Sequence, residues 1–402
     1  MNHLHIKKIS GKSVLFFFFI CYSQLIGGLQ IIYNSNVWTI MLHALIVLLL
    51  LYYFLVLPGY EKLICLGYPI VLLLILFLFP ETSALTGPNG IPRSLQLTSG
   101  FIGFYIGYLC LDNKNMRSVL KAVAILFFIY NVWDFVSGRV ADTGVYNMNF
   151  GFKAMFTSII ALFLSFSEET KWKKTVWLMT SLLLCIYIII IGSRGPVLGI
   201  GSIIVLTYGS LFIMNSNMRK ERKIVSVITV IVMILLYFAF SDQILSAIGK
   251  MLGAIGLDVS SSRNWNKILS GTLFRDVNRQ KLWLSFIKDF NWFGHGAYSS
   301  WYYKGIYPHN FFIEVIFDFG KIFGGLFIII FLAMVIYTNV HLRERKEFAL
   351  FVILLSYFIG RLITSFSFWW DTYFWMLIGV MAKFIFVLQR NYRKIDSAEL
   401  EA

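Results

Sequence analysis

The sequence predicts an all-α membrane protein that crosses the bilayer about twelve times, and three observations support this fold class. Of the 402 residues, 58% are hydrophobic and only 14% are charged, whereas soluble domains are about one quarter charged. The mean hydropathy is +0.74. Apolar runs of the length needed to cross a bilayer, about 20 residues, recur along the chain. Runs this long and apolar indicate helices rather than barrel strands, because a helix satisfies its own backbone hydrogen bonds in lipid.

Twelve apolar segments are predicted as transmembrane helices, and a long polar stretch precedes the last three. The segments are 13–33, 37–57, 63–80, 94–111, 118–137, 150–166, 175–192, 195–214, 224–242, 310–338, 348–366 and 370–389. We therefore expect nine helices in 1–242, a loop with amphipathic helices in 243–309, and three helices and a tail in 310–402. The first segment follows basic residues like a signal peptide, but no small-residue cleavage site follows it, which favours an uncleaved helix.

Basic residues are concentrated in alternate loops, and this asymmetry predicts the orientation. The formal net charge is +15. The opposite short loops carry Arg93 and Arg139 and little else. The positive-inside rule then places both termini in the cytoplasm and 243–309 on the outer side. Because the charge serves orientation, nucleic acid is not an expected partner, whereas membrane lipids are. The basic set is Lys7, Lys8, Lys12, Lys62, Lys114, Arg117, Lys121, Lys171, Lys173, Lys174, Arg219, Lys220, Arg222, Lys223, Arg343, Arg345, Lys346, Arg390, Arg393 and Lys394.

The polar stretch from Asp242 to Asn310 carries most of the residues suited to chemistry. Within it, apolar residues recur at helical spacing from Arg275 to Phe290, which predicts an amphipathic helix with one buried face. Arg279 stands one turn before Trp283 on that helix. The apolar positions are Leu282, Trp283, Phe286, Ile287 and Phe290, and the segments Gly294-His295-Gly296 and Pro308-His309-Asn310 follow.

Arg194 lies in the segment Gly192-Ser193-Arg194-Gly195-Pro196, between two apolar runs with almost no loop. An ionisable group in such a place is costly and usually functional. Gly192, Gly195 and Pro196 should end one helix and start the next, and a helix N-terminus attracts anions. The alternative is an arginine that reaches the lipid headgroups or caps the preceding helix. The cost of burying the charge favours a functional role.

Several outward-facing arginines suit an anionic substrate. A guanidinium stays charged and can hold phosphate oxygens in a bidentate manner, so two of them match a diphosphate. Arg279 is the strongest of the loop arginines, Arg263 and Arg275 are weaker candidates, and Arg361 lies near an outer helix end.

Only His295 and His309 of the six histidines are predicted to face outward. A histidine near arginines stays neutral and can act as a general base. Alternatively, His309 simply begins a helix and bonds to the backbone, since Pro308 and Asn310 also suit a cap. The outer loops show no metal-binding motif, so we expect no metal and no other cofactor.

These motifs together resemble the bacterial O-antigen polymerase and O-antigen ligase family. The likeness covers residues from about 190 to 330: Gly-Ser-Arg-Gly at 192–195, then Arg279 and Trp283, then Gly294 and Gly296. It continues with Pro-His-Asn at 308–310 before an apolar helix that carries Gly320, Gly324 and Gly325. The family is similar to membrane glycosyltransferases of the GT-C type, and its members use sugars carried on undecaprenyl diphosphate.

The resemblance implies a metal-independent glycosyltransferase of lipopolysaccharide biosynthesis in the bacterial inner membrane, with a periplasmic active site. Arg194 and Arg279 would hold the diphosphate, and His309 would deprotonate or orient the acceptor hydroxyl. Arg263, Arg275, Trp283, Asn310 and Arg361 are expected to bind substrate. A chain-length regulator and a flippase are the protein partners to expect.

Two other functions remain open. The Gly-Ser-Arg-Gly-Pro segment and Trp369-Trp370-Asp371 favour a polymerase, which extends a lipid-linked repeat unit, over a ligase, which transfers the glycan to lipid A–core. Because the stretch between Gly296 and His309 is short, the sequence does not decide between these two acceptors. A flippase for the same lipid-linked sugars is a further alternative, but it should carry charges along a path through its spans rather than on one face.

Overall fold

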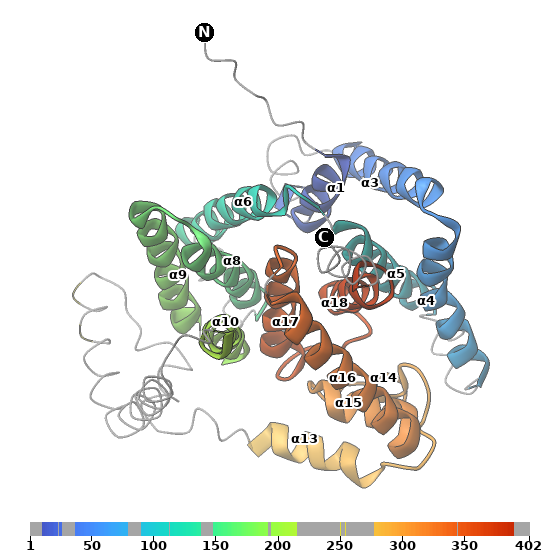
Figure 1. The fold of residues 1–402 in the computed structure, drawn as a ribbon. Coiled ribbons are helices and arrows are strands. Elements are labelled where there is room, and N and C mark those ends of the chain that lie inside the picture. The colour runs from blue at the N-terminus through green and yellow to red at the C-terminus, as the bar shows by residue number, and fades with distance from the viewer. Residues whose placement is uncertain are drawn as a thin grey trace. The chain divides into compact units, whose positions relative to one another are not determined.

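The computed structural model describes residues 10–22, 24–25, 37–78, 90–111, 113–137, 148–191, 194–214, 250, 254, 277–343 and 345–389. All regular structure within these ranges is helical. The helices are α1 (Gly11–Ile20), α3 (Val37–Val56), α4 (Gly59–Leu78), α5 (Gly90–Cys110), α6 (Met116–Val136), α8 (Met148–Ser167), α9 (Lys171–Ile191), α10 (Arg194–Met214), α13 (Val277–Lys288), α14 (Ser299–Lys304), α15 (Phe311–Phe319), α16 (Gly325–Leu342), α17 (Phe348–Leu362) and α18 (Thr372–Lys383). Two π-helical segments, η2 (Gly320–Gly324) and η3 (Phe384–Leu388), join or extend them (Figure 1).

The all-α class is confirmed, and apart from the first helix the described helices begin and end close to the predicted spans. The helix α1 ends at Ile20, whereas the predicted span is 13–33, of which residues 26–33 lie outside the described residues. Three helical stretches within the described residues are long and apolar enough to cross a membrane: Met116–Val136 (α6), Asn149–Ser167 in α8, and Phe311–Leu342, which combines α15, η2 and α16. The chain therefore has the character of a membrane protein, while the number of twelve spans stays a prediction. The predicted span 224–242 lies outside the described residues, as do Arg263 and Arg275.

The chain forms two compact units, residues 1–130 with 282–402, and residues 131–281. In the second unit α8 packs against α9 and α10. Buried polar pairs join its helices: Ser158 Oγ lies 2.6 Å from Ser181 Oγ, and Asn131 Nδ2 donates to Thr157 Oγ1 at 3.3 Å. Such bonds between apolar helices stabilise them in lipid by about 0.6 kcal/mol each.

The first unit is centred on the packing of α5 against α18. Gly103 and Gly107 on α5, and Gly379 on α18, allow this approach, because a Cβ on any of them would collide with the backbone of the opposite helix. Small residues one turn apart are the usual means by which membrane helices approach closely. A buried ion pair joins α18 to α4, with Lys383 Nζ 2.5 Å from Glu61 Oε2.

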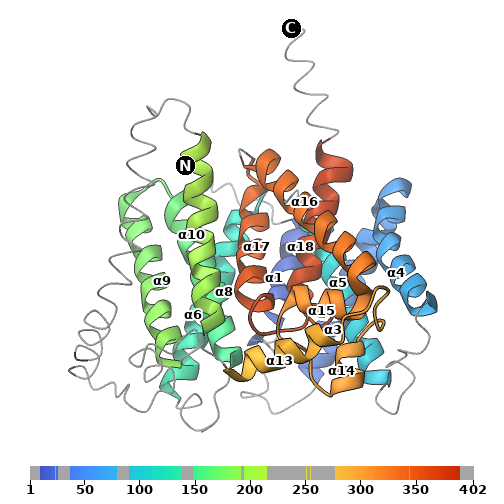
Figure 2. The same ribbon diagram turned by 90° about the horizontal axis from the view of Figure 1, so that it is seen from below.

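Five phenylalanines form a second core between α15, α16, α17 and α18. The ring of Phe311 lies 5.1–5.7 Å from the rings of the other four, all of which are buried. This apolar cluster fixes the start of α15, and so the loop that carries His309. Its members are Phe311, Phe331, Phe358, Phe368 and Phe374. Figure 2 shows α13 and α14 beside α15, crosswise to the upright α17 and α18.

The predicted amphipathic helix is present as α13. Phe286 is fully buried and its ring lies 4.9 Å from that of Phe317 on α15. The expectation that Ile287 shares this buried face is wrong, since its side chain is 45% exposed. The buried face is narrower than the sequence suggested, since Phe286 is the one buried residue among the described side chains of α13.

Candidate functional site

The long apolar helix predicted from residue 310 is broken at Gly320, and the Gly-x-Gly loop closes the break. Gly320 has φ +79°, and a π-helical turn follows it. The break leaves the carbonyl groups of Phe317 and Asp318 and the N–H groups of Lys321 and Ile322 without helical partners. Such groups must be satisfied inside the protein if the segment lies at membrane depth.

Loop 291–296 supplies those partners. His295 N–H donates to Phe317 O at 3.1 Å and Gly296 N–H donates to Asp318 O at 2.7 Å. In the other direction, Lys321 N–H donates to Asn291 O at 3.0 Å and Ile322 N–H to Trp292 O at 3.2 Å. The Gly294-His295-Gly296 motif therefore has a structural role that its sequence did not reveal.

Gly294 and Gly320 face each other at this junction. Both have positive φ, and a Cβ on either would collide with backbone atoms of the other's loop. Only glycine adopts these angles readily and leaves room for the opposite backbone.

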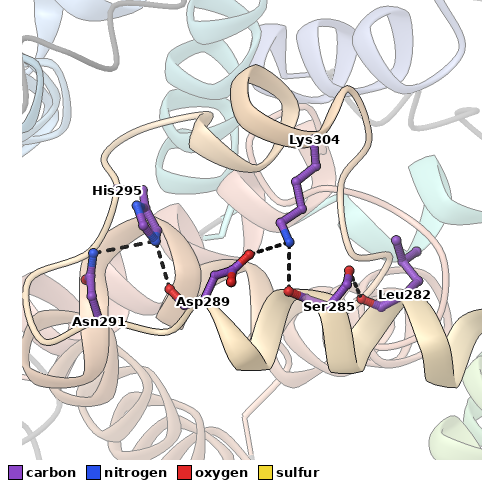
Figure 3. Close-up of polar contacts among 6 residues, drawn as sticks. All are labelled: Leu282, Ser285, Asp289, Asn291, His295 and Lys304. Carbon is purple, nitrogen blue, oxygen red and sulfur yellow. Dashed lines mark hydrogen bonds and ion pairs between the residues drawn. The ribbon is translucent and has the colours of Figure 1, made fainter.

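Polar side chains tie α14 to the end of α13 (Figure 3). Lys304 Nζ donates to Asp289 Oδ2 at 2.6 Å and to Ser285 O at 2.7 Å. His295 Nε2 lies 2.9 Å from Asp289 O, and Asn291 Nδ2 lies 3.5 Å from the same nitrogen. Since a carbonyl only accepts, His295 carries its proton on Nε2. Nothing in the sequence indicated that Lys304 would bond to Asp289 and Ser285.

The Lys304 ammonium holds the pKa of Asp289 below its ordinary value of 3.8, through a hydrogen bond and its charge. A lowered folded-state pKa contributes stability that is fully present above the unfolded pKa and is lost as the pH falls through the folded value. We expect Asp289→Asn to lower the Tm by a constant amount above about pH 5. This difference should shrink below pH 3.8 and in high salt, which thermal melts of both proteins between pH 3 and 7 would measure. An unchanged difference at pH 3 would contradict this assignment.

His309 is held at the start of α15 in an uncommon backbone conformation. Its φ is +55°, in the left-handed region. Its Nδ1 lies 2.7 Å from Ser365 O, in the loop between α17 and α18. Because the carbonyl accepts, Nδ1 carries the proton of the neutral ring, and Nε2 is the basic nitrogen.

The residues on either side of His309 anchor this loop. Trp283 Nε1 donates to Pro308 O at 2.8 Å, so the Arg-x-x-x-Trp helix is attached directly to the Pro-His-Asn segment. Asn310 caps α15, since its Oδ1 accepts from Phe312 N–H and Ile313 N–H at 3.1 and 3.2 Å. Its Nδ2 donates to Ile363 O at 3.2 Å. The amide of Asn310 is thus used within the protein, which favours positioning over the predicted substrate contact.

Two buried carboxylates on α15 accept hydrogen bonds from the loop between α17 and α18, which carries Ser365. Glu314 Oε1 accepts from Ser367 Oγ at 2.6 Å and its Oε2 from Phe368 N–H at 3.3 Å. Asp318 accepts from Trp369 Nε1 at 2.6 Å and from Ser299 Oγ at 2.7 Å. Both side chains are buried within the protein, so neither carboxylate faces lipid.

Arg361 also contacts the segment between α17 and α18. Its Nε lies 3.0 Å from Asp371 Oδ2, and its guanidinium lies 4.1 Å from the ring centre of Phe366. Tyr307, between the two loops, has a raised pKa because burial disfavours the phenolate and the charge of Glu314 adds to this effect. Tyr307 is therefore a neutral hydroxyl at neutral pH.

The predicted arginines fall in different parts of the chain. Arg279 is a half-buried residue of α13, one turn before Trp283. Arg194 is the first residue of α10, after α9 ends at Ile191, so the prediction of a helix junction at this motif is confirmed. Arg194 and Arg279 belong to the unit 131–281, and His309 and Arg361 to the other. The predicted convergence of Arg194 on His309 therefore stays a prediction.

No family model, curated protein or solved structure matches the chain. The site is consequently defined by its own geometry: a fixed imidazole, the bond from Trp283 to the residue before it, and a buried acidic pair. Among the described side chains, no group of three or more His, Cys, Asp or Glu is placed to hold a metal ion.

Proposed function

We propose that the chain is a membrane glycosyltransferase that polymerises a surface polysaccharide from undecaprenyl-diphosphate-linked repeat units. The observation that carries this proposal is the bond from Trp283 Nε1 to Pro308 O, together with the bond between His309 Nδ1 and Ser365 O. Trp283 of the helix that carries Arg279 is thus attached to the segment that carries His309, and this supports a shared role for Arg279 and the His309 imidazole, whose Nε2 is its basic nitrogen. An anion-binding group next to a fixed base suits the transfer of a group from a phosphate leaving group to a hydroxyl.

In the proposed reaction the acceptor hydroxyl attacks the anomeric carbon of the donor glycan. The bond between that carbon and the acceptor oxygen forms as the bond to the diphosphate oxygen breaks. His309 Nε2 takes the hydroxyl proton, and undecaprenyl diphosphate leaves with the electron pair. Arg279 and Arg194 stabilise its added charge by bidentate hydrogen bonds.

We place this site on the periplasmic side of a bacterial inner membrane, with both termini in the cytoplasm. The support for this orientation is the positive charge of the alternate loops. The arginines of the outer stretch would then meet a substrate that has already been moved across the membrane.

Arg279→Ala should lower polymer synthesis by about 10²–10³-fold, because a donor to the developing charge is removed. Arg279→Lys should recover only part of this loss, since an ammonium cannot bind phosphate in a bidentate manner. Lys281, an exposed residue of the same helix, offers a matched control, and Lys281→Ala should behave like the wild type. The measurement is polysaccharide chain length on a gel, with membrane protein levels quantified. Equal activity of Arg279→Ala and Lys281→Ala would remove Arg279 from the site.

A deletion strain separates polymerase from ligase. Loss of a polymerase leaves a single repeat unit on the lipid A–core, whereas loss of a ligase leaves none. We expect the first pattern, restored to a full ladder by the wild-type chain. A core without any repeat unit would instead identify the acceptor as lipid A–core.

A flippase remains a second candidate because of one observation. The ion pair of Glu61 with Lys383 is buried between α4 and α18, and charged pairs inside apolar helices can mark a transport path. Flippase activity predicts that lipid-linked units cross proteoliposome membranes with the chain present, and that Lys383→Met abolishes this movement. Polymer formation without movement would exclude it.

A further inference from the structure

A cluster of half-buried aromatic residues lies next to His309, outside the closed phenylalanine core. They come from three segments: α14, the loop before α15, and the loop between α17 and α18. Each has an intermediate exposure, in contrast to the buried phenylalanine cluster. We name this set the aromatic wall; its members are Trp301, Tyr307, Phe366 and Trp370.

The rings of the aromatic wall contact one another, and Tyr307 contacts His309. Tyr307 lies 4.3 Å from the His309 ring centre and 5.4 Å from that of Trp370. Trp301 lies 5.5 Å from Trp370 and 6.2 Å from Tyr307, with which it is stacked. The wall is therefore continuous with the imidazole.

One feature distinguishes the aromatic wall from a belt of residues at the lipid interface. Belt residues place separate rings among the headgroups, whereas these rings pack on one another and Tyr307 among them contacts His309. The indole nitrogen of Trp370 is buried and has no hydrogen-bond acceptor among the described residues.

We propose that the aromatic wall is the subsite for the acceptor glycan and binds a pyranose ring. One face of a pyranose consists of C–H groups and packs on an aromatic ring, which leaves the hydroxyl groups of the sugar available for polar partners. A sugar stacked on Tyr307 or Trp370 presents a neighbouring hydroxyl toward His309. This assignment depends on the proposed function for the identity of the acceptor, but binding of the sugar is independent of catalysis.

The test uses the purified full chain in nanodiscs and a defined probe, the repeat-unit oligosaccharide released by mild acid from lipid carrier in the deletion strain. Saturation-transfer NMR detects the sugar protons that contact the protein. Trp370→Leu and Trp301→Leu should weaken binding about 3- to 10-fold, the range expected for loss of one aromatic contact. Trp370→Phe keeps a ring and should lose less.

Trp292→Leu is the matched control. Trp292 is 63% exposed on the neighbouring loop, and its ring lies outside the aromatic wall. If these tryptophans only anchor the protein in the membrane, Trp292→Leu and Trp301→Leu will have equal effects, and the proposal is overturned. Absence of saturation transfer in the wild type also overturns it. Thermal melts verify that each variant is folded. If Trp370→Leu does not fold, the binding comparison uses Trp301→Leu instead.

Kinetics distinguish this inference from the proposed function. In assays of polymer growth, Trp370→Leu should raise the KM for the lipid-linked acceptor and leave kcat nearly unchanged. If the oligosaccharide binds but no polymer forms, the subsite stands and the proposed function fails. If polymer forms with the same KM in all variants, the proposed function stands and the subsite fails.

Discussion

Replacing His309 with asparagine should lower polymer synthesis by about 10²–10⁴-fold, the usual contribution of a general base. Asparagine is the right substitution because it tolerates the left-handed backbone at φ +55°, whereas a β-branched residue would be strained there. The variant should therefore fold but lack a group that can accept a proton. Polysaccharide ladders and turnover of lipid-linked units in membranes would measure the loss.

His295→Asn is the control for this prediction. His295 also lies in an irregular loop, but its Nε2 donates to Asp289 O and its ring contacts Phe317 at 4.5 Å. We expect a lower Tm and near-normal activity at low temperature. Similar activity losses for both histidine variants would show that the effect comes from loop structure and not from an imidazole base.

Gly294→Ala should prevent the protein from reaching its folded state in normal yield. The new methyl group would collide with the carbonyl of Asp318 and the backbone at Gly320, and the residue has φ +85°. Overpacking alone costs about 1–3 kcal/mol, and a positive φ adds to this cost. Because both atoms in the collision belong to the backbone, no side-chain rotation relieves it. Detergent-extracted yield and Tm are the measurements.

Gly325→Ala provides the comparison, since Gly325 is helical and has open space at its Cβ position. Alanine there should raise the Tm slightly, because helices favour alanine over glycine by up to about 1 kcal/mol. A Tm for Gly294→Ala equal to that of Gly325→Ala would mean that the loop does not pack against Gly320 as described.

The sequence predicted the helices well because each long apolar run specifies a helix through local hydrogen bonding alone. It also placed the helix junction at Arg194 and the helix α13 before the Gly-x-Gly loop. Arg279 and Trp283 were paired correctly on one helix, since a spacing of four residues determines this.

The tertiary contacts could not be predicted from the sequence. Nothing in the segment from residue 310 showed that the helix breaks at Gly320 or that loop 291–296 bonds to the break, because those partners are over 20 residues apart. The acceptor of His309, Ser365 O, is a backbone group 56 residues away that any amino acid could supply. Nothing in the sequence indicated that Asp371 would pair with Arg361 or that Lys304 would pair with Asp289, so both pairs emerged only from the fold.

The most direct test of the account is reconstitution of the purified chain in liposomes with undecaprenyl-diphosphate-linked repeat units. Glycan length is followed on gels and free undecaprenyl diphosphate by mass spectrometry. We predict a ladder of longer glycans, with one undecaprenyl diphosphate released for each linkage, and neither product with His309→Asn. A folded wild-type chain that leaves glycan length and carrier unchanged, or an active His309→Asn, would contradict it.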